Sequence, residues 1–295
     1  MRLAGRSAIV TGAGNGIGKA CAIELARHGA MVVVNDLGTD EYGAGRTSKA
    51  AEKTVSEIED LGGKAIPNCD SVADSAGCEA LVHAGVAAYG QVDIVVACAG
   101  ALLDATLQAS DDDYRRFIDL FLSQKFWLAR ATIPAMVERG WGRLITTTSH
   151  GATGLLGSPI FAAAMGGVIS LTKAIAFEQQ GTGVTANCLA PGAQTRLAKK
   201  THARFEAMHE AGQISDEDWD RFLDQPPPKY VAPIVAWLGS DAASGVSGEV
   251  FHATGGLVSR WTRYEDERGV YRGDHRTVAP WTLDELDSVV PKMLL

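Results

Sequence analysis

Short apolar runs alternate with longer amphipathic segments along most of the chain. The runs are rich in β-branched residues and apolar on both faces, which is typical of strands buried in a parallel sheet. A segment with helical periodicity follows each run, and this alternation persists to about Thr254. The pattern predicts a doubly wound α/β fold with strands at SAIVT (7–11), AMVVVND (30–36), VDIVVACAG (92–100), GRLITTTS (142–149) and GVTANCLAP (183–191).

Two segments depart from the alternation. Residues 197–225 are charged and helical in pattern, end at three prolines (226–228), and follow a predicted strand, where a lid over a ligand would lie. A solvent-exposed surface segment fits that composition equally well. We expect a nucleotide-binding domain at 1–260 that carries this insert (197–228), and a charged, aromatic extension (261–295) that packs on its own domain or on a neighbouring subunit.

Composition narrows the class of protein. The chain has 295 residues, of which 46% are hydrophobic, enough for one substantial core. A net charge of −8 argues against nucleic acid as a partner. The five cysteines follow no disulfide or metal-binding pattern, and we expect neither a leader segment nor an apolar run long enough to cross a bilayer. A cytoplasmic protein without a membrane partner and without a metal site is therefore expected.

The strongest local motif is TGAGNGIG, at Thr11–Gly18 between the first strand and the first helix. Glycines there permit a tight turn and let backbone N–H groups at a helix N-terminus approach a pyrophosphate. Asp36 ends the second predicted strand, where a carboxylate can accept hydrogen bonds from ribose hydroxyls and repel a 2′-phosphate. The motif predicts NAD as cofactor on a Rossmann-type sheet; the alternative is a turn needed only for helix packing.

The spacing of this loop resembles that of the short-chain dehydrogenase/reductase family. VVVNDLG (32–38) and GGKAIPNCDSV (62–72) resemble, more narrowly, the dehydrogenase part of peroxisomal multifunctional enzyme type 2. That branch acts on 3-hydroxyacyl-CoA and 17β-hydroxysteroid substrates. The resemblance covers residues 5–255 and extends more loosely into the tail.

The resemblance implies a largely retained cofactor site. Cys98 replaces the usual asparagine of an Asn-Ala-Gly turn, so the backbone turn is kept while the side-chain amide is lost. The implied cofactor-binding residues are Gly12, Asn15, Gly16, Ile17, Gly18, Asp36, Asp70, Ser71, Cys98, Ala99, Gly100, Pro191, Gly192 and Thr195.

The catalytic positions that the resemblance implies are all substituted. In the family a tyrosine transfers the proton, a lysine four residues later lowers its pKa, a serine orients the substrate oxygen, and an asparagine completes a proton relay. Alignment without a gap places Phe161, Met165, Thr148 and Phe121 at these positions. Phe161 has no acid or base, and Met165 has neither charge nor donors. The family mechanism of hydride transfer is therefore not expected.

One surrogate group is a candidate. His150 lies two residues beyond Thr148, and imidazole is a competent acid and base near neutral pH. A solvent-facing or hydrogen-bonded core histidine is the favoured interpretation. Lys173 lies two helical turns past Met165, about 12 Å away, and is too far to replace the missing lysine.

Three hypotheses follow for function. The first is a non-catalytic NAD-binding subunit that pairs, in a homo- or hetero-oligomer, with an intact dehydrogenase paralogue. The second is an active oxidoreductase on a hydroxyacyl-CoA or steroid-like substrate with a departed mechanism. The third is a protein that binds acyl-CoA or a steroid-like small molecule without redox chemistry. We place the first slightly ahead of the second, and the third behind both.

Overall fold

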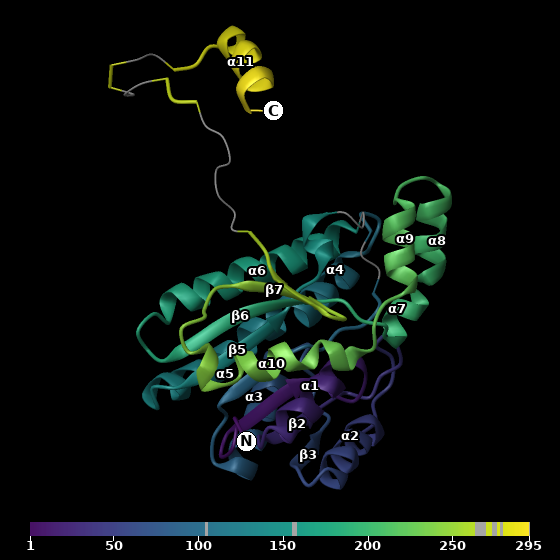
Figure 1. Cartoon of the computed structure of the whole chain (residues 1–295), viewed down its shortest axis with the longest axis vertical. Coiled ribbons are helices and arrows are strands. Elements are labelled where there is room, and N and C mark those ends of the chain that lie inside the picture. The colour runs from purple at the N-terminus through teal and green to yellow at the C-terminus, as the bar shows by residue number, and fades with distance from the viewer. Residues whose placement is uncertain (104–105, 155–157, 263–269, 273–275, 278–279, 295) are drawn as a thin grey trace. The chain divides into compact units, whose positions relative to one another are not determined.

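The computed structural model describes the chain except for residues 104–105, 155–157, 263–269, 273–275, 278–279 and 295 (Figure 1). Contacts divide the chain into two compact units, Met1–Arg260 and Trp261–Leu295. Each is described by itself below.

The larger unit is built on one eight-stranded sheet with the order β3-β2-β1-β4-β5-β6-β7-β8. Neighbouring strands are parallel except for β7 and β8, which are antiparallel. The chain reverses direction across the sheet after β3, so β1 and β4 are neighbours, as in a doubly wound fold. The predicted α/β fold is confirmed, with strands at Ser7–Thr11, Met31–Asn35, Lys64–Asn68, Ile94–Ala97, Gly142–Thr147, Val184–Pro191, Val250–Thr254 and Leu257–Arg260.

Helices cover both faces of this sheet. One core packs α1, α2 and α10 against alternate residues of the central strands, and the other packs α3, α5 and α6 against the remaining ones. Because both faces are covered, successive residues of a strand are buried whichever face they point to, as in the run Val32, Val33 and Val34. The helices span Gly16–Arg27 (α1), Lys49–Asp60 (α2), Ser75–Tyr89 (α3), Asp111–Ile118 (α4), Gln124–Glu138 (α5), Pro159–Glu178 (α6) and Ala232–Leu238 (α10).

Helix α6 corrects one expectation. Its 20 residues, with a mean hydropathy of 1.8 in the most apolar window, meet the length and composition of a membrane-crossing helix. The expectation that no apolar run is long enough was therefore wrong. The helix packs against β5 and β6 and contributes Val168 and Ile169 to the buried residues, and a core helix passes the same test.

The charged segment after β6 is helical, as its composition predicts. Helix α7 (Arg196–Lys200) leads into α8 (His202–Glu210) and α9 (Asp216–Leu223), which form a hairpin at one side of the unit (Figure 1). Aromatic rings join the two hairpin helices, with Phe205 stacked on Phe222 at 4.2 Å between centroids. A 3₁₀ turn, Pro228–Tyr230, then leads to α10. Whether the hairpin serves as a lid stays a prediction.

The smaller unit contains α11 (Leu283–Val289), which continues into a π-helical turn (Val290–Leu294). Thr282 and Glu285 form a reciprocal capping box at the start of α11. Arg272 pairs with Glu285 at 2.7 Å and lies over the ring of Trp281. The surface on which this unit packs stays a prediction.

Candidate functional site

The glycine loop between β1 and α1 adopts a conformation that side chains would obstruct. Gly12 and Gly16 have φ values of 64° and 56°, in the left-handed region that favours glycine. A Cβ on Gly18 would lie 2.3 Å from the carbonyl oxygen of Gly12. Asn15 is exposed at the N-cap of α1 and makes no side-chain capping bond there. The loop therefore presents the start of α1 as a site for an anion.

Asp36 is fixed at the end of β2 by two backbone donors. Its Oδ2 accepts from the amide of Gly14 at 2.8 Å, and its Oδ1 accepts from the amide of Gly38 at 2.8 Å. Asp36 is 8% exposed, so its carboxylate is largely shielded from solvent. Each carboxylate oxygen can accept a further hydrogen bond, which suits ribose hydroxyls.

Polar side chains also follow β3, at the same edge of the sheet. Asp70 accepts from the side-chain amide of Asn68 at 2.8 Å and pairs with Arg46 at 3.8 Å. Ser71 is partly buried, and its hydroxyl accepts from the amide of Ala73. These residues follow Asp36 around the rim, at the edge where open α/β sheets bind their ligands.

The turn after β4 lies directly against the glycine loop. A Cβ on Gly12 would lie 2.8 Å from the Cα of Ala99, and a Cβ on Gly100 would lie 2.9 Å from the ring of Phe121. Burial raises the pKa of the Cys98 thiol to about 11, so the thiol stays neutral near pH 7 and is a poor nucleophile. The turn thus touches the glycine loop on one side and a phenylalanine on the other.

The segment after β6 closes the cleft opposite α1. A Cβ on Gly16 would lie 3.4 Å from Cγ2 of Thr195, whose hydroxyl caps α7 by accepting from the amide of Ala198. Pro191 ends β6, and Gly192 follows it; both pack against β7. Ile17 lies one residue into α1 and is partly buried.

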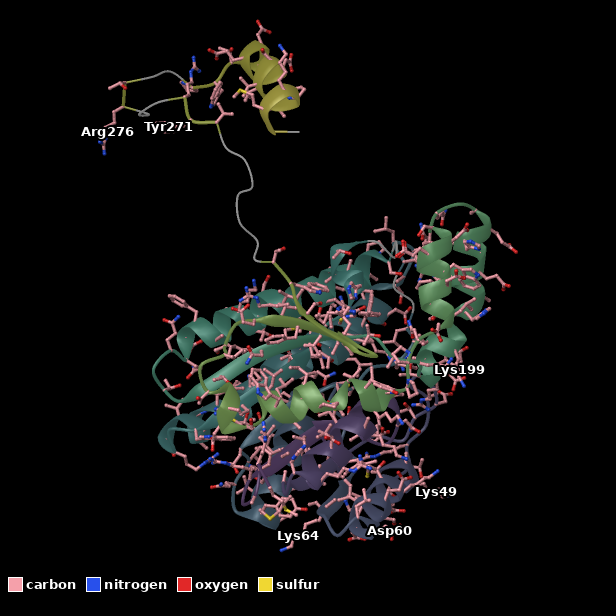
Figure 2. All side chains as sticks on the ribbon, in the orientation of Figure 1. Lys49, Asp60, Lys64, Lys199, Tyr271 and Arg276 are labelled. Carbon is pink, nitrogen blue, oxygen red and sulfur yellow. The ribbon has the colours of Figure 1, made fainter. Side chains whose placement is uncertain are left out.

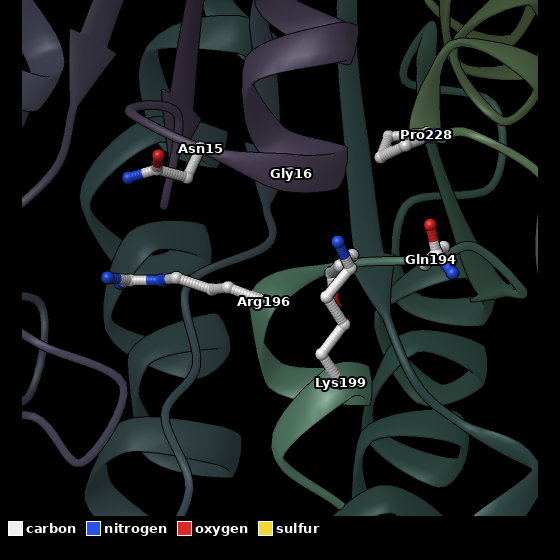
Figure 3. A pocket seen from close by; sticks show the side chains of 7 residues that line it. Asn15, Gly16, Gln194, Arg196, Lys199 and Pro228 are labelled. Carbon is white, nitrogen blue, oxygen red and sulfur yellow. The ribbon is translucent and has the colours of Figure 1, made fainter. Parts of the chain in front are cut away.

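A cavity of about 290 Å³ lies between the glycine loop and the start of α7. Figure 3 shows Lys199 extending from α7 toward the start of α1, and Figure 2 shows the same residue at the surface. Arg196 is anchored by donating to the carbonyl of Thr39 at 3.1 Å. Arg196 and Lys199 lie outside the glycine motif and were not predicted from the sequence. Their only signal there is that two basic residues are spaced about one helical turn apart. The lining residues are Asn15, Gly16, Gln194, Thr195, Arg196, Lys199 and Pro228.

Two of the predicted catalytic positions, Phe121 and Phe161, come together in an apolar cluster. The rings of Phe121 and Phe161 meet edge to face at 5.8 Å between centroids. Phe117, which sequence reasoning missed, stacks on Phe121 at 4.4 Å and meets Phe161 at 6.0 Å. We call these three residues the phenylalanine cluster. A π-helical turn, Asp119–Ser123, carries Phe121 between α4 and α5, and such turns are frequent at functional sites.

Thr148 and Met165 are joined to each other. The hydroxyl of Thr148 donates to the carbonyl oxygen of Met165 at 2.9 Å, and both side chains are buried, with 5% and 3% exposed. The next residue, Ser149, is only partly buried, and its hydroxyl accepts from the amide of Gly151. Ser149 is therefore the hydroxyl nearer to solvent, and a gap of one residue before Phe161 would align it with the family serine.

His150 is exposed at the start of a 3₁₀ turn, His150–Thr153. Its ring meets that of His252 on β7 edge to face, at 4.4 Å between centroids. A ring nitrogen of His252 lies 2.8 Å from the carbonyl oxygen of Ala190, and its Cε1 lies 3.5 Å from where a Cβ of Gly192 would be. The candidate surrogate thus has a second imidazole beside it, near the turn after β6.

A buried lysine lies behind the phenylalanine cluster. Lys125 is 1% exposed, and its ammonium lies 6.0 Å from the ring centroid of Phe121. No hydrogen bond or ion pair to this ammonium occurs among the residues that the structure describes. Burial lowers the pKa of Lys125 to about 8, and the thiols of Cys98, Cys188 and Cys78 raise it slightly in the opposite direction.

The cleft fits a dinucleotide. A helix N-terminus, left-handed glycines and two cations suit a diphosphate, and the fixed carboxylate of Asp36 suits a ribose.

Among the described residues, no group of three or more His, Cys, Asp or Glu side chains is arranged to hold a metal ion.

Comparison with known proteins agrees with this geometry. A family model described as Enoyl-(Acyl carrier protein) reductase matches residues 12–258. The chain is 36% identical, over 89% of its length, to peroxisomal multifunctional enzyme type 2 of Mus musculus, but it covers only 34% of that protein. The chain thus spans about a third to a half of the length of the first curated relatives it matches.

Two solved structures share the fold. A short chain dehydrogenase from Mycobacterium avium is 31% identical with a TM-score of 0.79, covering 100% of this chain and 96% of its own. A 7α-hydroxysteroid dehydrogenase complexed with NADH and 7-oxo glycochenodeoxycholic acid is 30% identical with a TM-score of 0.70, covering 86% and 95%. The predicted cofactor class, NAD, agrees with the NADH in that relative. The family model matches most of the length of the chain, and the solved short-chain dehydrogenase shares its fold. The chain therefore belongs to the short-chain dehydrogenase/reductase family.

Proposed function

We propose that this protein binds NAD(H) in the cleft at the start of α1 but does not itself carry out the family's proton transfer. In this proposal it acts as a non-catalytic subunit that partners an intact hydroxyacyl-CoA or hydroxysteroid dehydrogenase. The observation that carries the proposal is the phenylalanine cluster. Phe121 and Phe161, which the family resemblance aligns with the asparagine and the tyrosine, pack on each other and on Phe117 without a group that can move a proton.

The buried pair beside the cluster supports the same conclusion. Met165 stands at the family position for lysine, where its thioether offers neither charge nor hydrogen-bond donors to a nicotinamide ribose. Thr148, at the ungapped serine position, already donates its hydroxyl to the Met165 carbonyl. Loss of a general acid or base costs about 10²–10⁴ in rate, and losses within one working unit do not simply add.

The relatives support a proposal for the substrate class of the partner. One relative is a multifunctional enzyme of peroxisomes, and another was solved with an oxidised bile acid. A hydroxyacyl thioester or a steroid alcohol is therefore the proposed substrate of the partner. Members of the family typically oligomerise, so a mixed assembly requires no new mode of association.

The second candidate is an active oxidoreductase whose mechanism differs from that of the family. The observation that favours it is the placement of Ser149, His150 and His252 near the turn after β6, where a hydroxyl and two imidazoles lie close together. In this candidate Ser149 would orient a carbonyl and an imidazole would supply the proton.

One experiment separates these functions. NADH is titrated calorimetrically into the purified chain, and single-turnover oxidation of NADH is then followed at saturating 3-oxoacyl-CoA or oxo-steroid. Binding without turnover by the chain alone, together with co-purification of an intact paralogue, supports the proposal. Turnover that persists in the chain alone and falls in His150→Ala supports the second candidate. Binding of acyl-CoA without binding of NADH would instead indicate a protein without redox chemistry and contradict the proposed cofactor site.

A further inference from the structure

Gln124 is a fully buried amide at the first turn of α5. It is 0% exposed and follows directly on the π-helical turn that carries Phe121. A buried amide is costly unless its hydrogen bonds are satisfied, so its partners indicate what it holds in place.

The partners of Gln124 all lie beside the cofactor cleft. Its Nε2 donates to the carbonyl oxygen of Ala99 at 3.0 Å, and also to the carbonyl of Leu120 in the preceding π-helical turn. Its Oε1 accepts from the hydroxyl of Thr11 at 3.4 Å. One side chain therefore links the end of β1, the turn after β4 and the start of α5.

Thr11 completes this connection. Its hydroxyl accepts from the backbone amides of Cys98 and Ala99, at 3.0 Å each. Thr11 thus holds the N–H groups of the turn, while Gln124 holds the carbonyl of Ala99 and orients the Thr11 hydroxyl. Cys98 carries only a neutral thiol, which is a weak hydrogen-bond donor and acceptor.

The turn held in this way has little room to move. Ala99 packs against Gly12 of the glycine loop, and Gly100 packs against the ring of Phe121, both so closely that an added Cβ would clash. A shift of Ala99 by a few tenths of an ångström would therefore be transmitted to the floor of the cleft.

We propose that Gln124 is a positioning residue for the cofactor, whose amide on α5 replaces the side-chain amide that the turn lacks at Cys98. It acts through Thr11 and Ala99 and does not touch the ligand. This inference rests on the proposed cofactor site at the glycine loop.

The test compares three substitutions of buried polar side chains. Gln124→Leu removes all three side-chain hydrogen bonds at similar size, and Thr11→Val removes the partner hydroxyl at nearly the same volume. Asn187→Leu is the matched control, because Asn187 is 1% exposed and bonds to Val246 and Glu249, which precede β7 and lie at the opposite edge of the sheet. Affinity for NADH is measured by calorimetry, and the melting temperature is measured without ligand.

All three variants are expected to melt at lower temperature than the parent. Gln124→Leu and Thr11→Val are further expected to weaken NADH binding by about tenfold, the equivalent of one neutral hydrogen bond, while Asn187→Leu binds as the parent does. Adding Cys98→Asn to Gln124→Leu is expected to recover most of the affinity. Unchanged affinity in Gln124→Leu, or a loss of equal size in Asn187→Leu, would overturn the inference.

Hydrogen exchange measured without ligand tests the role of Gln124 even if the unsubstituted protein does not bind NADH. Gln124→Leu is expected to speed exchange at the amides of Cys98 and Ala99 while leaving the amide of Glu249 unchanged, and Asn187→Leu is expected to do the reverse. A parent that fails to bind NADH while this exchange pattern holds would reject the proposed function alone. Equal exchange at both places in both variants would reject the role of Gln124.

Discussion

The cofactor cleft and the phenylalanine cluster touch each other but depend on different parts of the chain. The cleft uses backbone amides, glycine conformations and one carboxylate, so few side chains decide whether it can bind a dinucleotide. In the proposed function, proton transfer would need particular side chains, and the cluster offers only apolar ones. Binding would then be distributed over the backbone, whereas chemistry would depend on a few side chains.

The largest effect is expected from restoring chemistry. The double variant Phe161→Tyr with Met165→Lys should raise NADH-linked reduction of a 3-oxoacyl-CoA or oxo-steroid by about 10²–10⁴ over the parent, which is the usual contribution of an acid-base group. Phe161→Tyr alone should gain little, because the tyrosine pKa would remain near its ordinary value without the adjacent cation. The rate is followed by NADH absorbance. A double variant that binds NADH normally yet stays inactive would show that the defect extends beyond these two positions.

The second effect concerns the backbone of the cleft. Gly18→Ala would put a Cβ 2.3 Å from the Gly12 carbonyl oxygen and should weaken NADH binding by about tenfold to a hundredfold, the cost of overpacking a tight contact. Gly245→Ala is the matched control, since nothing lies within 4 Å of its added Cβ. Calorimetry measures both. Equal affinities in the two variants would mean that the cofactor does not bind at the glycine loop.

The third effect tests the buried charge behind the cluster. The pKa of Lys125 is lowered to about 8 from its ordinary value of 10.5, so burying its ammonium costs about 3 kcal/mol below pH 8. This cost falls as the pH rises from about 8 through 10.5, because the folded protein then holds the neutral amine and the unfolded chain loses its proton too. Lys125→Met should therefore raise the free energy of unfolding by about 1–3 kcal/mol at pH 7 and by much less near pH 10.

Urea unfolding of the parent and of Lys125→Met at pH 7, 8.5 and 10 measures this difference. The neighbouring thiols of Cys78, Cys98 and Cys188 are present in both proteins, so the difference isolates the lysine. A difference that does not vary with pH would indicate that the ammonium is paired or hydrated.

The smallest effect is expected at the rim of the cleft. Lys199→Met removes one exposed cation near the start of α1 and should weaken NADH binding by about threefold to fivefold at low salt, and by less as salt screens the charge. Lys64→Met, on β3, is the control for net charge and should bind as the parent does (Figure 2). Equal losses in both variants would assign the effect to overall charge rather than to the cleft.

Local motifs were sufficient to predict the fold and the cofactor loop. The strand, glycine turn and helix from Ser7 to Gly18 are contiguous in the chain, and the alternation of apolar runs fixes a parallel sheet without long-range information. The resemblance assigned Phe121 and Phe161 to one site, and their rings are in contact in the structure. Phe117 was missed because its place in the cluster depends on how α4 packs on α6.

Other features depend on spatial neighbours that no motif encodes. An alignment without a gap puts Thr148 at the serine position, whereas an alignment with a gap of one residue puts Ser149 there. In the structure the side chain of Thr148 points inward, and that of Ser149 points toward solvent. Gln124 and Lys125 look like ordinary polar residues of an amphipathic helix, yet both are buried. His252 comes near His150 only because β7 lies beside β6.

The two amide bonds to Asp36 have a consequence for the thermodynamics of binding. They tie the glycine loop to the residues after β2 before any ligand arrives, so the two walls of the adenosine end are already ordered. Little conformational entropy then remains to be lost on binding, and a preorganised site binds more tightly for the same contacts. A dinucleotide bound at such a preorganised site would also stabilise the folded chain, because a ligand that binds only the folded state shifts the unfolding equilibrium toward it.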